Sequence, residues 1–384
     1  MRAVITGGGV AGSAGAIALA RIGVEVTVYE AYQDPAGPVG SFVSLAVNGL
    51  RALDALGCLD AVRRAGFDVA RQRMWSGSGK LLGDVARGRR PADTLHSVTL
   101  LRADLVTALR DQARHCGARI VTGQRVSGAA ADREDADLFV GADGIWSGTR
   151  RELDPAAPEP AYAGLYSVSG VSDLSRVPAD LPRDGFNWVF ARRGVFIYLP
   201  APDGTVWWTA QVVATEPPHD RAGVSLADLS DLFRTERPAA AVLGAATAIR
   251  AVNPGYVLKP VSRRYAGRTV LIGDAAHPAG AGQGASMALE DAVILARHIA
   301  TGSAVPDALA AFDRERRPRA GKLAAMETRS RDAKTSGPIT AWARSLVMPH
   351  LFNHFYEKAT GWLYDINPGS LTLPAAPTST ARNH

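Results

Sequence analysis

Hydrophobic positions at the start of the chain follow a strand pattern, then a helix pattern, then a strand pattern again. Residues 2–6 form a short apolar run with β-branched side chains, which is typical of a buried strand. Residues 10–22 are small and apolar, which favours a helix packed closely on a sheet. Residues 25–29 read as a second strand that ends at Glu30. The pattern therefore predicts a β-α-β unit at the start of the chain.

Helical spacing returns further along the same part of the chain. Residues 48–56 and 101–116 carry apolar side chains three and four positions apart, and a glycine follows each segment. A longer helix is predicted over residues 284–299. Three more apolar runs are predicted as strands of the first sheet: 118–122, 136–140 and 269–272.

The pattern changes from about residue 162, where strand-like segments follow one another with turn sequences between them. The predicted strands are 166–171, 186–191, 195–199 and 205–213, followed by a helix over 226–234. This order predicts an antiparallel sheet inserted between two halves of an α/β nucleotide-binding domain.

Charge changes this picture little. The 384 residues include 43 Lys and Arg against 37 Asp and Glu, a net charge of +6. Nucleic-acid binding is the alternative that such a charge raises, but the basic residues are scattered, without a basic stripe between aromatics. We interpret them as a solvated, arginine-rich surface. The densest group, Arg314 to Arg319, falls where we expect a helix to end, a position that suits cations.

The two cysteines, Cys58 and Cys116, form no CxxC pair and no cluster with histidines. We therefore expect neither a metal site nor a disulfide framework, and a reducing cytoplasm fits best. The segment from Arg2 to Ala20 superficially resembles a signal peptide, but Gly7 to Gly9 would interrupt its apolar core. No apolar run is long enough to predict an integral membrane span.

The first turn carries the glycines of a dinucleotide site. Gly7 permits a tight turn after the strand, Gly9 lets backbone approach a pyrophosphate, and Gly12 lets helix and strand pack closely. Val10 and Ala11 would offer free N–H groups at the helix N-terminus. Glu30 stands where an acid accepts hydrogen bonds from a ribose diol, and its charge would repel a 2′-phosphate. The motif therefore predicts FAD or NAD; a glycine turn without a ligand is the alternative.

The segment that begins at Gly273 decides between these dinucleotides. Four segments follow one another along the chain: Gly7-x-Gly9-x-x-Gly12 with Glu30, Leu101-Arg102-Ala103-Asp104-Leu105, Gly141-Ala142-Asp143-Gly144, and Gly273-Asp274-Ala275-Ala276-His277-Pro278 running into Gly282-Gln283-Gly284-Ala285. With these segments, the sequence resembles the FAD-dependent monooxygenases of the para-hydroxybenzoate-hydroxylase type over residues 1 to about 320.

The resemblance implies a role for each of these residues. Asp274 would bond the ribityl chain of FAD, and the backbone of Gly282, Gly284 and Ala285 would face the flavin pyrimidine ring. Pro278 would lie beside the reacting C4a face.

Three further residues carry two interpretations each, and a fourth carries one. Arg102 reaches the FAD phosphates or ribose, or is an ordinary surface arginine. Asp143 lies between the flavin and the NAD(P)H approach, or caps a turn. His277 acts as an acid or base, or is packed; the second interpretation is favoured. Val126 is predicted to present backbone to adenine.

The chain departs from the family pattern after Pro278. Only Ala279, Gly280 and Ala281 precede Gly282, so the loop is shorter than usual and lacks the family's second proline. We expect this loop to lie differently beside the flavin.

A substrate pocket is expected between the flavin and the inserted sheet. Alternation places Phe196 and Tyr198 on one face of their strand and Ile197 on the other. Trp188 and Trp207 lie on neighbouring strands. Such residues suit a flat aromatic substrate; ordinary sheet core is the alternative for each of them.

The resemblance implies an α/β fold with a Rossmann-like FAD-binding domain, an inserted antiparallel β-sheet substrate domain and a C-terminal helical region. We predict an FAD-binding domain over 1–160 and 255–320, a substrate domain over 161–254, a helical segment over 321–368 and a flexible tail over 369–384. The aromatic segment from Trp342 to Leu363 is predicted to cover the substrate domain; contact with a membrane surface or a second copy is the alternative.

The implied activity is NAD(P)H-dependent hydroxylation or epoxidation of an electron-rich small molecule by O₂, through a flavin C4a-hydroperoxide. NADH or NADPH would bind only transiently, and no second glycine motif for it is present. The alternative is a flavin reductase or desaturase of a prenyl or polyketide substrate. The Trp-x-Trp-x-Ile-Pro signature of flavin halogenases is absent from this sequence. A non-catalytic flavin protein is the remaining class. We expect a monomer or a homodimer.

Overall fold

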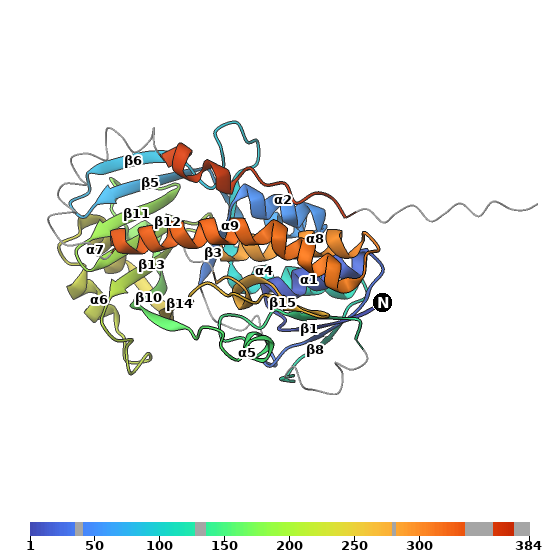
Figure 1. Cartoon of the computed structure of the whole chain (residues 1–384). Helices are drawn as coiled ribbons and strands as arrows, with labels where there is room; N and C mark the ends of the chain where they lie inside the picture. The colour runs from blue at the N-terminus through green and yellow to red at the C-terminus, as the bar shows by residue number, and fades with distance from the viewer. Residues whose placement is uncertain (35–40, 127–135, 279–281, 335–355, 372–384) are drawn as a thin grey trace, which may run out of the picture.

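The computed structural model describes residues 1–34, 41–126, 136–278, 282–334 and 356–371. Figure 1 shows a sheet with helices α1, α4 and α8 at one end of the molecule and a second sheet, with strands β5, β6 and β10–β14, at the other. Helix α9 runs along both parts. The α/β fold class expected from the sequence is confirmed.

The first sheet has six strands and is parallel except at one edge. The pair β15–β16 is antiparallel. The strand order in this sheet is β15 (Tyr265–Ala266), β16 (Thr269–Leu271), β9 (Leu138–Gly141), β1 (Arg2–Thr6), β2 (Glu25–Tyr29), β8 (Arg119–Val121). Because the central strands are parallel, β1, β9 and β16 deliver their carboxyl ends to one edge, where ligands bind in open α/β sheets.

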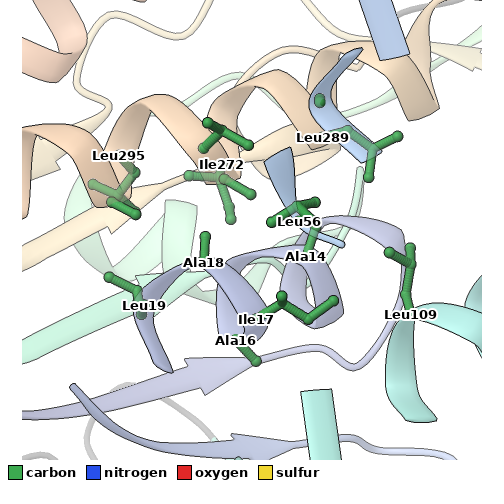
Figure 2. Packing of buried hydrophobic residues seen from close by; sticks show 14 of the residues in the cluster. Ala14, Ala16, Ile17, Ala18, Leu19, Leu56, Leu109, Ile272, Leu289 and Leu295 are labelled. Carbon is green, nitrogen blue, oxygen red and sulfur yellow. The ribbon is translucent and has the colours of Figure 1, made fainter. Parts of the chain in front are cut away.

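Small side chains let three helices pack together over this sheet. Helix α1 (Val10–Arg21) contacts both α4 (Arg102–His115) and α8 (Gly284–Ile299) in the main core. Figure 2 shows Ala14 and Ala18 of α1 close to Ile272 and to Leu289 and Leu295 of α8. The predicted bounds of α8 are confirmed. This close packing fixes the N-termini of α1 and α8 relative to each other.

The second sheet has seven strands. Its order is β14 (Ala246–Val257), β10 (Ala161–Asp173), β13 (Thr205–Val213), β12 (Gly194–Pro200), β11 (Phe186–Ala191), β5 (Arg71–Ser76), β6 (Leu81–Ala86). The sequence did not indicate that β5 and β6, which come from within residues 1–160, extend this sheet. They join through a parallel pairing of β5 with β11, so the sheet is antiparallel except at that step.

The remaining elements connect or cover the two sheets. A small antiparallel sheet contains β3 (Phe42–Leu45), β7 (Ser97–Leu101) and β4 (Phe67–Val69). Other helices of the described ranges include α2 (Val47–Ala55), α3 (Leu59–Ala65), α5 (Gly148–Leu153), α6 (Leu226–Leu232), α7 (Arg237–Gly244) and α9 (Val305–Lys334), with single 3-10 turns at Leu174–Arg176, Gly273–Ala275 and Gly361–Leu363.

Helix α9 corrects the expectation that a helix ends near Arg314 to Arg319. The helix continues through Pro318 to Lys334. The interpretation of this arginine group as solvated surface is also wrong for Arg316, which is 2% exposed, because it meets two carboxylates of α8.

The C-terminal part is described only in pieces. Most of the aromatic segment from Trp342 to Leu363 lies outside the described residues, as do Ala279 to Ala281 and most of the expected tail. Residues 356–360 are helical, and Tyr356 packs against Met74, Leu82 and Val85 of β5 and β6. Leu363 packs instead with Ala46, Val47 and Met287 of the FAD-binding part, so the covering of the substrate domain by this segment stays a prediction.

Candidate cofactor and substrate site

The first glycine motif forms the turn between β1 and α1. Gly7 has a φ of +94°, a backbone conformation that favours glycine, and its N–H donates to the carbonyl of Tyr29 at 2.8 Å. A Cβ at Gly7 would overlap the carbonyl oxygen of Ala142, and a Cβ at Gly12 would overlap that of Gly7. Both glycines are therefore required by packing alone, before any ligand binds.

Gly9 is different, because packing does not require it. A Cβ there would meet only the Nη2 atom of Arg102, at 3.9 Å. Gly9 is the N-cap of α1, makes no side-chain capping hydrogen bond, and has no acid in the following turn. The positive end of the α1 dipole, its free N–H groups at Val10 and Ala11, and Arg102 thus converge on open space. This arrangement fits a pyrophosphate.

Glu30 lies directly beneath this turn and is 6% exposed. Its Oε2 accepts from the N–H of Gly8 at 2.7 Å, and its Oε1 accepts from the N–H of Tyr32 at 2.9 Å. These bonds fix the carboxylate at the end of β2 and leave each oxygen a lone pair for a ribose hydroxyl.

The second glycine motif meets the first one. Gly273 has a φ of +59°, and a Cβ there would lie 2.7 Å from the Cβ of Ala11. The 3-10 turn at Gly273–Ala275 therefore starts against the N-terminus of α1. Asp274 within it is exposed, as a residue that binds a ligand in the groove needs to be. The two motifs thus form one continuous site.

The N-terminus of α8 completes that site. Gly282 has a φ of +78°, and α8 begins at Gly284 and Ala285 without a side-chain cap and without an acid in its first turn. Free N–H groups and the dipole make this end suitable for the electron-rich edge of a flavin pyrimidine ring.

His277 is held by a carboxylate behind the second motif. Its side chain is 9% exposed, and Nε2 donates to Oδ2 of Asp291 at 2.7 Å. The same oxygen accepts from the N–H of Gly273 at 2.9 Å. Burial raises the pKa of Asp291, but the charges of His277 and Arg316 and these hydrogen bonds outweigh it and hold the pKa well below its ordinary value. The packed role expected for His277 matches this geometry.

Sequence reasoning missed the charged network that anchors α8. Arg316 donates from Nε to Asp291 and from Nη1 to Glu290, both at 2.7 Å. Glu290 also accepts from Arg319 and from Asn48 of α2. Glu290 and Asp291 are fully buried in a stretch of α8 that is otherwise apolar from residue 287 to residue 296. Two adjacent acids in such a helix were the available signal, because buried carboxylates require basic partners.

Asp143 shows the turn-capping contacts that were its alternative interpretation. One carboxylate oxygen accepts from Ser147 Oγ at 2.5 Å, and the other accepts from the N–H and the hydroxyl of Thr149, each at 3.0 Å. These bonds shape the loop between β9 and α5. A role toward NAD(P)H stays a prediction, as does the adenine contact of Val126, which lies half-buried after β8.

A cavity of about 780 Å³ lies beside the second motif. Asp274, His277 and Pro278 line one side, strands β10 and β14 line another, and residues 320–328 of α9 close a third. Ile145 from the Asp143 loop also borders it. The cavity is large enough for a small-molecule ligand. In the described ranges, no three His, Cys, Asp or Glu side chains lie together as a metal site would require.

Comparison with known proteins agrees with this geometry. Residues 1–327 match the family model described as an FAD binding domain. This chain belongs to that family of FAD-dependent monooxygenases.

Among its relatives, a kynurenine 3-monooxygenase from Salinispora arenicola is 30% identical and aligns with 85% of this chain and 78% of the relative. A 3-amino-4-hydroxybenzoate 2-monooxygenase from Streptomyces cremeus is 31% identical, over 84% and 85% of the two chains. The solved structure of Klebsiella pneumoniae HpxO with FAD and uric acid has the same fold, with a TM-score of 0.75 and 21% identity, over 97% and 96% of the chains.

The expected cofactor, FAD, and the enzyme class, an oxidoreductase that consumes O₂ and NAD(P)H, are thereby confirmed. The alternative of a reductase or desaturase is not favoured, because the relatives are named monooxygenases. In the described part of the chain, no helix is long and apolar enough to cross a membrane.

The substrate sheet of this monooxygenase corrects one grouping. Phe196 and Tyr198 do share a face, but that face packs into the core formed with α6 and α7. Trp188 and Trp207 lie on the opposite face, with Phe42 of β3 and the other residues of a second cluster. The four aromatics therefore do not line one pocket. Only Trp188 and Trp207 stand on the side that adjoins the small sheet of the FAD-binding part.

Proposed function

We propose that this FAD-dependent monooxygenase inserts one oxygen atom into a planar aromatic or heteroaromatic small molecule, with NADH or NADPH as the electron donor. The observation that carries the proposal is the junction of the two glycine motifs at Gly273 and Ala11, which brings the turn beside Glu30 and the loop that leads to α8 into one site. Bound FAD would supply hydride acceptance and oxygen activation, chemistry that no protein side chain provides.

Different residues of this site would bind different parts of FAD. Glu30 would bind the ribose diol of FAD, and Gly9 with Arg102 would bind its phosphates. Asp274 would bind the ribityl chain, and the N–H groups at the start of α8, from Gly284 and Ala285, would stabilise negative charge on the reduced ring. Pro278 would border the reacting edge, with His277 held behind it by Asp291.

An aromatic substrate is supported by the sheet face that Trp188 and Trp207 share. Trp207 contacts Phe42 and Phe67, with ring centroids 6.0 and 5.4 Å apart, and all three side chains are only partly buried. Such a face suits a flat ring and excludes water from it. The two relatives described above act on kynurenine and an aminohydroxybenzoate, and the HpxO structure contains uric acid; each of these compounds contains a planar ring.

The nicotinamide nucleotide is proposed to approach through the 780 Å³ cavity, because Ile145, two residues after Asp143, lines it. A cytoplasmic location is proposed because Cys58 and Cys116 are free thiols and because the enzyme consumes NAD(P)H. A monomer or a homodimer is proposed, and light scattering distinguishes the two.

A ligand-stimulated oxidation assay tests the proposed function. The purified FAD-loaded enzyme should oxidise NADH or NADPH slowly alone and at least about tenfold faster with one or more members of a panel of aromatic and heteroaromatic compounds. Aliphatic compounds of similar size provide the control. Protein that retains no FAD, or whose FAD no nicotinamide nucleotide reduces, would contradict the proposal.

A further inference from the structure

A segment near the end of the chain is held by arginines from three helices. Residues 361–368, the C-terminal strap, pass over α2 in Figure 1, where they are drawn in red. Carbonyl oxygens of the strap accept hydrogen bonds from Arg51 of α2, Arg297 of α8 and Arg319 of α9. The strap itself contains a single 3-10 turn. Its position therefore depends mainly on the helices that it contacts.

The apolar side of the C-terminal strap lies against the start of two helices. Leu363 and Tyr364 are 3% and 5% exposed, and they pack in one cluster with Val47 of α2 and Met287 of α8. Met287 stands in the first turn of α8, beside the N-terminus at which the proposed function places the flavin ring. The strap therefore adjoins the flavin end of the cofactor site, although it contributes none of the residues assigned to FAD.

A buried set of hydrogen bonds connects the C-terminal strap to the cofactor loop. Arg319 donates from Nη2 to the carbonyl of Leu363 at 2.8 Å and to Oε1 of Glu290 at 2.7 Å, and its Nε donates to Oε2 of Glu290 at 2.8 Å. Glu290 also accepts from Nδ2 of Asn48 at 2.7 Å. The same Nδ2 donates to Oε1 of Gln283, the N-cap of α8, at 3.3 Å. One continuous chain of bonds thus runs from the strap to the start of α8.

The burial of this chain of bonds leaves its members little freedom to move. Glu290 is fully buried, and the side chain of Arg319 is 12% exposed. Their ion pair is costly to break, because Arg319 would be left as a buried, unpaired charge. In the described part of the chain, Oδ1 of Asn48 is buried without a hydrogen bond, so Nδ2 alone fixes the amide that holds Gln283. A shift of Arg319 would therefore be transmitted to Gln283.

We propose that docking of the C-terminal strap and binding of FAD are coupled through Arg319, Glu290 and Asn48. The docked strap holds Gln283 and the first turn of α8 in the position that binds the flavin ring. Bound FAD in turn stabilises the docked strap, because a coupling free energy between two sites is reciprocal. This inference rests on the place that the proposed function gives the flavin ring, and it adds a second region of the chain that controls how tightly FAD is held.

Hydrogen exchange in the wild-type protein tests the coupling directly. Amide exchange is followed by mass spectrometry in the apoprotein and in the FAD-loaded protein. FAD should slow exchange by at least about threefold in peptides that cover residues 361–371, because it stabilises the docked strap. Peptides from α6, which packs in the core on the other face of the substrate sheet, provide the control and should exchange at the same rate in both forms.

Arg319→Met removes the guanidinium that joins the C-terminal strap to Glu290. FAD should bind about 5- to 50-fold more weakly to this variant, and the slowing of strap exchange by FAD should be lost. Fluorimetric titration measures the affinity, and the unfolding temperature of each apoprotein is recorded with it. If Arg319→Met does not fold, Arg51→Gln carries the test. Arg51 holds the carbonyls of Tyr364 and Ile366 from α2, so its loss should weaken FAD binding by at least about threefold.

Arg297→Gln is the matched control. Arg297 also donates to a strap carbonyl, that of Pro368 at 2.9 Å, but it stands in the last turn of α8, at the end opposite the flavin site. Its side chain is 42% exposed, so this bond contributes little to docking. FAD affinity should change by less than about threefold in this variant.

Two results would overturn the inference. The first is a wild-type protein in which FAD leaves the exchange of residues 361–371 unchanged. The second is an Arg319→Met variant, or Arg51→Gln in its place, that binds FAD as tightly as the wild type, whatever its unfolding temperature, which would give the network a structural role alone. A wild-type protein that retains no FAD refutes the proposed function instead, so the two failures are distinguishable.

Discussion

Asp291 shows how one buried side chain links the cofactor loop to the body of the enzyme. It accepts hydrogen bonds from the N–H of Gly273, from His277 and from Arg316, and it is fully buried. The loop that carries Asp274 therefore takes its position from a carboxylate on α8. Because the three donors favour the charged form, the stability that Asp291 contributes depends on pH.

Asp291→Asn should lower the free energy of unfolding by about 3 kcal/mol at pH 7, because it leaves Arg316 and His277 without this carboxylate. The pKa of Asp291 is depressed in the folded state, so its contribution is complete above the unfolded-state value of about 3.9 and is lost as the pH falls through the folded value. Denaturant unfolding at several pH values should show the wild type and the variant converging below about pH 4.

Asp231→Asn is the control for this experiment. Asp231 forms an exposed ion pair with Arg234, so its replacement should change the free energy of unfolding by less than about 1 kcal/mol at either pH. A difference between the wild type and Asp291→Asn that stays constant from pH 7 to pH 3 would show that Asp291 does not titrate as the structure requires.

At the scale of elements, the turn from β1 to α1 separates glycines needed for folding from a glycine needed for the ligand. Gly12 touches backbone, whereas Gly9 faces open space beside Arg102. A sequence motif treats these glycines alike. In the structure, packing requires Gly12, whereas Gly9 leaves space for a ligand. Replacing each glycine with alanine distinguishes these two roles.

Gly12→Ala should destabilise the protein by about 3 kcal/mol or more even without FAD, because its Cβ overlaps the carbonyl of Gly7. Gly9→Ala should fold with the unfolding temperature of the wild-type apoprotein, but bind FAD at least about tenfold more weakly. Calorimetry of the apoproteins and fluorimetric titration with FAD measure the two effects. Equal stability for Gly12→Ala, or normal FAD binding by Gly9→Ala, would refute this division.

The bounds of α1 and α8 were predictable from the sequence because their patterns are local. Small apolar residues after Gly9, and a long apolar run after Gly284, determine these helices without help from distant segments. The pairing of β5 with β11 was not predictable in this way. It joins Gln72 to Phe186 across a long separation in the chain, and no local pattern indicates such a partner.

The alternation of side chains along a strand likewise showed which residues share a face of the sheet. It did not show which other elements that face contacts. Phe196 and Tyr198 are on one side of β12, as expected, yet the helices α6 and α7 cover that side. The arginines of α9 gave a similar difficulty, because a charge cluster is usually solvated and only tertiary packing brings Glu290 and Asp291 to Arg316.

Considered as a whole, the molecule places one cofactor groove between a parallel sheet that binds a dinucleotide and a second sheet that presents aromatic side chains. Helix α9 spans both parts in Figure 1, and its buried Arg316 is bonded to α8, whose N-terminus faces the groove. In the proposed function, this architecture would bring a flavin and a flat substrate together in a region from which side chains exclude water.

The source of the oxygen atom in the product tests this account most directly. The FAD-loaded enzyme is incubated with NAD(P)H and an aromatic compound that stimulates its oxidation, once under ¹⁸O₂ in ordinary water and once under ordinary O₂ in H₂¹⁸O, and the product is analysed by mass spectrometry. We predict a product that gains one labelled oxygen atom under ¹⁸O₂ and none from labelled water. A reduced or desaturated product without label from ¹⁸O₂ would contradict the assignment of this enzyme as a monooxygenase.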